Sequence, residues 1–213
     1  ENVWAHWSRG NYGPGDWSGS HNDLAAGVDL YHTDHSRAGI SVMHTNSSLD
    51  RTENLGEVSM KKKFTRVSLY GRHDFAGGLH AAGDVFAGGI RIKDTSLVDM
   101  STRTAGVHAE VGVDVPAGRG TITPLVRAAY AGIRGFTTKD GEGFPFTMKE
   151  SHYSSFSAGL KASLPLSPVS LLTAYAGWGI RTGYDIDGTM SDAWNTMDIS
   201  ESGKEHVKTL GIG

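Results

Sequence analysis

The stretch from Thr104 to Tyr130 constrains the fold most, because it has the pattern of two alternating strands joined by a polar turn. Side chains of a β-strand reverse face at every residue, so this period predicts strands. Pro116 to Gly120 interrupts the ladder, and the alternation resumes at Thr123. The apolar stripe must face a protein core or a lipid bilayer. Its first half consists of Ala105, Val107, Ala109, Val111, Val113 and Val115.

Composition limits the class of protein. The chain has 213 residues, which we treat as one domain spanning residues 1–213, and 29 of them are glycine. No window approaches 18 consecutive apolar residues, which excludes helical membrane spans. The net charge of -3 gives no reason to expect nucleic acid, and we interpret Lys61 to Lys63 as a solvated strand end. The absence of cysteine excludes disulfides and thiolate metal sites.

About ten strand patterns follow one another along the chain, and their connections alternate between short and long. Short connections lie at 33–36, 76–78, 116–120 and 165–168, and long ones at 12–21, 45–63, 92–103, 135–153 and 182–205. Strict alternation sends every long loop to one end of the sheet and every tight turn to the other. Outer-membrane barrels have this asymmetry, with short turns on one side and longer loops on the other.

Alternation alone does not separate a barrel that is apolar outside from a sandwich that is apolar inside. Three features favour the barrel: the loop alternation, strands of about 9 to 15 residues, and polar-edged aromatic residues near strand ends. We therefore predict an all-β, antiparallel up-and-down transmembrane β-barrel, with a soluble β-sandwich as the alternative. The aromatic residues are Trp4, Trp7, Tyr12, Trp17, Tyr31, Tyr130 and Trp194.

The polar stripe would line the interior of such a barrel, with charges of both signs. The predicted pore-lining residues are Asp29, Arg66, Arg72, His80, Asp84, His108, Glu110, Asp114, Arg127, Lys161 and Arg181. We predict no catalytic residue, no metal and no cofactor. A metal site at His21, His32 and His35 with Asp23 and Asp34 is less favoured than exposed turn residues. A barrel-rim hydrolase is also disfavoured, because no Ser, His and Asp constellation is evident.

Several weak motifs, taken in order, resemble the β-barrel translocator domain of autotransporters, the type V secretion proteins of Gram-negative bacteria. They begin with Val3-Trp4-Ala5 and Ala26-Gly27-Val28-Asp29, followed by Ser68-Leu69-Tyr70-Gly71 and Thr123-Pro124-Leu125. The run Leu172-Thr173-Ala174-Tyr175-Ala176-Gly177 resembles the family's recurring TPYAG strand, with Ala174 where proline is usual. Their order and spacing cover nearly all of the chain.

The resemblance implies an outer-membrane barrel that anchors and exports an N-terminal passenger domain to the cell surface and is not an enzyme. It implies twelve strands when complete, about ten of them represented here, and we expect the terminal strands and the passenger to lie outside these residues. Ten strands alone should leave open edges, which are costly in lipid. The implied partners are the outer-membrane bilayer, the chain's own passenger and pore helix, and the barrel assembly machinery, but no nucleic acid.

Two further possibilities are compatible with the sequence. Some autotransporters cleave their passenger inside the pore with acidic residues, and Glu110 or Asp114 could serve, although lumen electrostatics is the favoured role. Alternatively, the barrel is a passive porin-like channel, or a surface adhesin that binds through loops 45–63 and 182–205.

Overall fold

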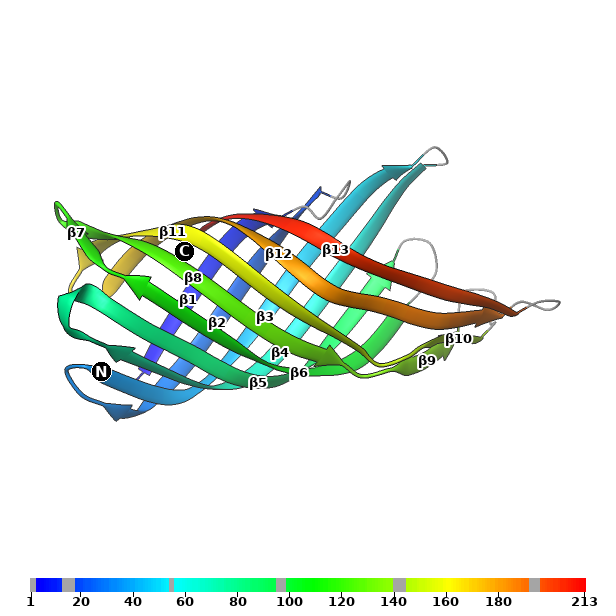
Figure 1. Cartoon of the computed structure of the whole chain (residues 1–213), viewed down its shortest axis with the longest axis horizontal. Coiled ribbons are helices and arrows are strands. Elements are labelled where there is room, and N and C mark those ends of the chain that lie inside the picture. The colour runs from blue at the N-terminus through cyan, green and yellow to red at the C-terminus, as the bar shows by residue number, and fades with distance from the viewer. Residues whose placement is uncertain (1–2, 13–17, 54–55, 95–98, 140–144, 192–195) are drawn as a thin grey trace.

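The computed structural model describes residues 3–12, 18–53, 56–94, 99–139, 145–191 and 196–213, and nearly all of them lie in β-strands (Figure 1). The long strands are β1 (Val3–Tyr12), β2 (Ser18–His32), β3 (Ser36–Glu53), β4 (Gly56–Asp74), β5 (Leu79–Asp94), β6 (Asp99–Val113), β8 (Gly120–Ile133), β11 (Ser151–Ser167), β12 (Ser170–Ser191) and β13 (Thr196–Ile212). The short elements are η1 (Ala76–Gly78), β7 (Val115–Ala117), β9 (Phe136–Lys139) and β10 (Pro145–Met148).

The long strands form one closed antiparallel sheet. Successive long strands pair from β1 to β13, and β13 returns to pair with β1. This arrangement confirms the predicted all-β, up-and-down barrel. It also excludes the β-sandwich, which packs two separate sheets face to face.

Closure corrects the expectation that both sheet edges would be open. The last strand begins at Thr196 rather than at His206, and its far end therefore reaches β1, where Arg9 to Tyr12 pair with residues 209–212. Within the described strands, residues 3–8 of β1 pair with β2 alone. The expected total of twelve strands stays a prediction.

Tight turns connect the strands at one end of the barrel, at the left in Figure 1. Two of these turns depend on glycine in the left-handed region: Gly77 has φ 77° and Gly118 has φ 61°. An L side chain is strained there, so glycine is the default residue. The predicted turn at 116–120 is shorter than expected, because β7 still pairs with β8 around Gly118 and Arg119.

The predicted long loops at the other end are mostly strand. The described residues 45–53 and 56–63 form the outer part of the β3–β4 hairpin, with Thr45 opposite Phe64 and Glu53 opposite Gly56. Residues 182–191 and 196–205 form a similar β12–β13 arm. These arms extend to the right in Figure 1. In each arm the two strands satisfy each other's backbone hydrogen bonds.

The barrel is apolar outside and polar inside. Exposed fractions on the outer face include 57% for Leu69, 51% for Val85 and 58% for Phe156. Inward residues are closed off: Ser68 is 3% exposed and Thr123 is 0% exposed. In the described part of the chain, no helix is long and apolar enough to span a membrane.

Only part of the predicted aromatic girdle can be placed. Trp7, Tyr31 and Tyr130 are on the outer surface, with exposed fractions of 53%, 57% and 49%. The prediction is wrong for Trp4, whose indole points inward to a hydrogen bond with Tyr70. Trp17 and Trp194 lie outside the described residues, as does the side chain of Tyr12.

Candidate functional site

The barrel interior contains an open cavity of about 920 Å³, lined by residues of β1, β3, β4, β5, β6, β8, β11 and β12. Basic and acidic groups from the polar faces of β4, β5, β6, β8, β11 and β12 project into it. The predicted residues among its lining are Arg66, Arg72, Asp84, His108, Glu110, Arg127, Lys161 and Arg181. A smaller cavity of about 600 Å³ adjoins it at the tight-turn end.

One charged cluster joins three neighbouring strands. Arg66 on β4 places Nη1 3.3 Å from Asp84 Oδ2 on β5. His108 on β6 has Nδ1 3.0 Å from Asp84 Oδ1 and 3.0 Å from Arg66 Nη1. The His108 ring also stacks on Phe86, with centroids 4.8 Å apart. The cluster is part-buried, so each charge needs its partner.

A second cluster centres on Glu110. Glu110 on β6 stands directly opposite Arg127 on β8, and Arg127 Nε donates to Glu110 Oε2 at 2.6 Å. Its other oxygen, Oε1, lies 3.3 Å from His80 Nε2. His80 is 0% exposed, which makes it the most enclosed ionisable side chain of this group. A charge-assisted contact of this kind is stronger than one between neutral groups.

A third cluster lies at the tight-turn end and contacts His80 from the other side. Arg72 Nη2 is 2.6 Å from Asp74 Oδ1 and 2.9 Å from Asp114 Oδ2. Thr123 donates its hydroxyl to Asp114 Oδ1 at 2.5 Å. His80 Nδ1 lies 3.5 Å from Asp114 Oδ2. The imidazole therefore links the second and third clusters.

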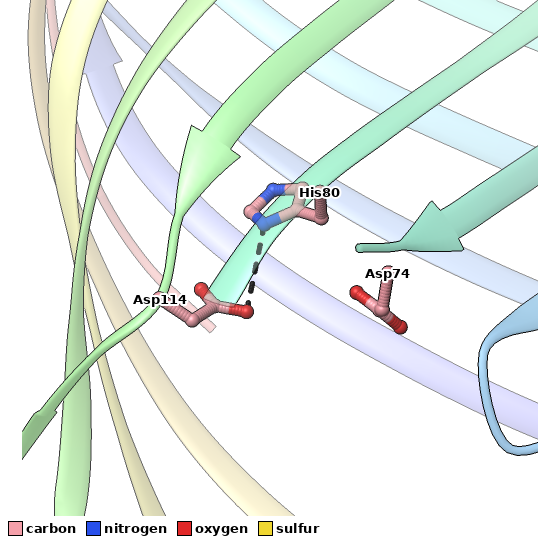
Figure 2. A group of neighbouring side chains, drawn as sticks. All are labelled: Asp74, His80 and Asp114. Atoms are coloured by element: carbon pink, nitrogen blue, oxygen red, sulfur yellow. Dashed lines mark ion pairs between the residues drawn. The ribbon is translucent and has the colours of Figure 1, made fainter. Parts of the chain in front are cut away.

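Asp74, His80 and Asp114 each offer one possible metal-ligand atom, and these atoms lie within 4.8 Å of one another (Figure 2). The end of β4, the start of β5 and the segment after β6 bring these side chains together. However, the Arg72 guanidinium already contacts both carboxylates. A bound cation would have to displace that charge, so the geometry favours an ion-pair network.

Asp29 belongs to a separate site near β1. Its carboxylate is 6% exposed and accepts the Tyr70 hydroxyl at 2.5 Å, while Trp4 Nε1 donates to Tyr70 at 2.6 Å. Glycine makes room for both rings: a Cβ at Gly27 would lie 2.5 Å from the Trp4 ring, and one at Gly39 would lie 2.7 Å from the Tyr70 hydroxyl. The indole therefore has a buried partner inside the barrel.

The structure joins eight of the predicted residues in the three charged clusters: Arg66, Asp84, His108, Arg72, Asp114, His80, Glu110 and Arg127. Asp29 lies apart with Tyr70, while Lys161 and Arg181 line the cavity from β11 and β12. The prediction missed Trp4, Tyr70, Asp74 and Thr123. The alternation of β4 places Tyr70 on the polar face with Arg66 and Arg72, so its inward position could have been predicted from the sequence.

His21 lies near one end of β2, whereas His32 and His35 lie at the other end. His21 is 3.6 Å from Asp23, and His32 is 3.5 Å from Asp29, each through a ring nitrogen and a carboxylate oxygen. His35 is exposed in the turn after β2. The structure does not bring these three histidines together as ligands.

Sequence comparison identifies the family. The profile of the autotransporter β-domain matches residues 2–168, well over half of the chain. The chain belongs to this family. An autotransporter β-domain is a transport barrel and not an enzyme. No curated protein matches the chain by sequence.

Solved autotransporter barrels share the fold. The β-domain of the Bordetella autotransporter BrkA aligns over 100% of this chain and 98% of its own, with 12% identity and a TM-score of 0.59. The transport unit of AIDA-I from Escherichia coli gives 15% identity, coverage of 100% and 89%, and a TM-score of 0.54. The translocator domain of NalP from Neisseria meningitidis aligns over 100% of this chain and 88% of its own, with 14% identity and a TM-score of 0.51. At such low identity, these likenesses support the fold alone.

Proposed function

We propose that this autotransporter β-domain sits in the outer membrane and carries an N-terminal passenger through its interior to the cell surface. The observation that carries the proposal is a polar cavity of about 920 Å³ inside a closed barrel with an apolar exterior. So many exposed apolar side chains would mark a contact surface on a soluble protein. On a barrel they suit contact with lipid.

The interior suits a segment of polypeptide in transit. Basic side chains of β4, β8, β11 and β12 and acidic side chains of β5 and β6 share the cavity wall. The ion pairs at the wall offer hydrogen bonds to a passing backbone, and the excess of basic over acidic side chains gives the cavity a positive field. The proposed partners are the membrane, the passenger, a pore helix and the barrel assembly machinery. No bond chemistry is assigned to the barrel.

The test narrows the cavity without changing the outer surface. Ala129 on β8 lines the cavity, whereas Ala158 on β11 is exposed on the outer face opposite Trp178. In the full-length protein with an epitope placed before residue 1, we expect Ala129→Trp to reduce surface exposure of the epitope strongly. Protease treatment of intact cells provides the measurement.

Ala158→Trp is the matched control and should leave surface exposure unchanged. Heat-modifiable gel mobility shows whether each variant still forms a barrel. Equal surface exposure in both variants, with both barrels folded, would contradict passage through the cavity. That result would favour the porin-like or adhesin alternative.

A further inference from the structure

The outer face of β4 and β5 carries cations in register at the end opposite the tight turns. Lys61 stands directly opposite Lys93, and Lys63 stands directly opposite Arg91. All of these side chains are exposed. Like charges directly opposite one another destabilise a sheet. A neighbouring anion would offset the repulsion within these two adjacent pairs, and the sheet provides only part of the negative charge needed.

The cations continue onto neighbouring strands. Arg103 on β6 is exposed, and its carbonyl accepts the backbone N–H of Arg134, which follows β8, at 2.9 Å. Together these residues define the basic patch. It consists of Lys61, Lys63, Arg91, Lys93, Arg103 and Arg134, all exposed on the outside of the barrel.

Few described acids balance the basic patch. Asp99 Oδ2 lies 2.7 Å from Arg91 Nη2 and 3.1 Å from Lys93 Nζ. Asp50 on β3 is half-buried opposite Ser59, one step beyond the patch toward the loops. Lys61, Lys63 and Arg103 form no ion pair with any residue in the described part of the chain. The patch therefore retains a net positive charge.

The basic patch begins where the apolar exterior ends. On β5 the outward face is apolar from Leu79 to Ala87, and Arg91 follows two outward positions later. On β6 the outward face is apolar from Val113 to Ala105, and Arg103 is the next outward residue. A tilted strand needs about 9 to 11 residues to cross the hydrocarbon layer. This places the patch at the level of lipid head groups.

We propose that the basic patch binds the phosphate groups of anionic lipid in the leaflet around the loop end of the barrel. This inference rests on the proposed membrane location. Adjacent strands lie about 4.8 Å apart and alternate residues about 7 Å apart, so one phosphate can contact cations on two strands. Arginine holds phosphate through paired hydrogen bonds and lysine holds it as a point charge. Basic residues near a membrane surface attract anionic lipid in the same way.

The test uses native mass spectrometry of the purified, detergent-folded barrel, titrated with a diphosphorylated glycolipid, phosphatidylglycerol or phosphatidylcholine. We expect both anionic lipids to stay bound and phosphatidylcholine to dissociate. The triple variant K61Q/K63Q/R103Q should bind the anionic lipids at least about tenfold more weakly. The variant Asp99→Asn should bind them more tightly, because it removes the patch's internal counter-charge.

The control triple variant R9Q/R119Q/K139Q removes three exposed cations outside the patch and should bind like the wild type. Equal lipid binding by the two triple variants would overturn the proposal. So would displacement of the lipid by inorganic phosphate alone, because the site would then be a free-anion site.

A separate measurement keeps this proposal distinct from the proposed function. Folding of the wild type into phosphatidylcholine vesicles, followed by heat-modifiable mobility, tests the membrane location alone. Failure to insert would overturn the membrane location and, with it, the lipid site. Insertion without preference for anionic lipid would overturn only the lipid site.

Discussion

Trp4 and Tyr70 are 66 positions apart in the sequence, and the indole N–H of one donates to the hydroxyl of the other at 2.6 Å inside the barrel. Tyr70 in turn donates to the buried carboxylate of Asp29. One hydroxyl thus satisfies two side chains, on β1 and on β2. Removing it leaves an orphaned donor and a buried charge, which costs more than the hydrogen bonds themselves contribute.

Tyr70→Phe should therefore lower the free energy of unfolding by about 1–3 kcal/mol, because two buried polar partners lose their contact. Urea unfolding of the barrel in lipid vesicles, followed by tryptophan fluorescence, measures the change. Tyr130→Phe is the matched control, since Tyr130 is 49% exposed on the outer face. Equal effects of the two substitutions would argue against the buried bridge.

Glu110 and Arg127 should be energetically coupled, because they stand opposite each other with a 2.6 Å contact. We expect E110Q and R127Q each to destabilise the barrel and the double variant to cost less than their sum, with a coupling of about 0.5–3 kcal/mol. Urea unfolding of the single and double variants gives this value. Asp99 lies at the end of β6 opposite to Glu110. The changes in unfolding free energy caused by R127Q and D99N should therefore add in the double variant. Additivity in the E110Q/R127Q pair would show that the contact is not formed.

Asp99 lies at the loop end of β6, beyond the apolar part of the strand. Hydrogen bonds from Arg91 and then Lys93 hold the pKa of its carboxyl well below its usual range. A lowered folded pKa gives stability that is present above the unfolded pKa of about 3.9 and is lost as pH falls through the folded value. The contacts of Asp99 with Arg91 and Lys93 should therefore contribute no pH dependence of stability between neutral pH and about pH 5.

The measurement for Asp99 is an NMR titration of its carboxyl carbon in detergent. In R91Q/K93Q the pKa of Asp99 should rise toward its ordinary value, whereas Arg119→Gln in the distant turn should leave the lowered pKa in place. An unchanged pKa in R91Q/K93Q would contradict the stated cause.

The fold could be predicted from the sequence because side chains alternate cleanly where one face of a strand meets an apolar surrounding. Val107 and His108 were assigned to opposite faces, and the structure places them so, with Val107 46% exposed and His108 in the charged cluster. The arms of β3–β4 and β12–β13 were predicted as loops because their apolar alternation is short, with Tyr184, Ile186 and Met190 in one arm and Val58 and Met60 in the other, among many Asp, Ser, Thr and Gly residues. Closure escaped prediction for the same reason, since β13 begins inside a predicted loop.

The contacts within the interior needed the register between strands, which no single strand encodes. Strict alternation puts Trp4 on the same strand face as His6 and on the face opposite to Trp7, but we predicted Trp4 at the membrane interface because it is an aromatic residue near a strand end. His80 was predicted to line the pore, but it is 0% exposed between Glu110 and Asp114. That enclosure arises from strand pairing, because β6 brings both acids to the start of β5.

Val111 and Ala176 provide the most direct test of which face meets lipid. Both are exposed on the outer face, on β6 and β12 respectively. Val111→Arg or Ala176→Arg should cost about 2–4 kcal/mol in a bilayer if these positions lie near the midplane. Urea-driven unfolding from phosphatidylcholine vesicles measures the cost. Ala117→Arg in the exposed turn is the control and should be nearly neutral, because that position meets water. If neither substitution changes stability, the membrane location is contradicted, because an arginine costs little free energy only where the surface contacts water.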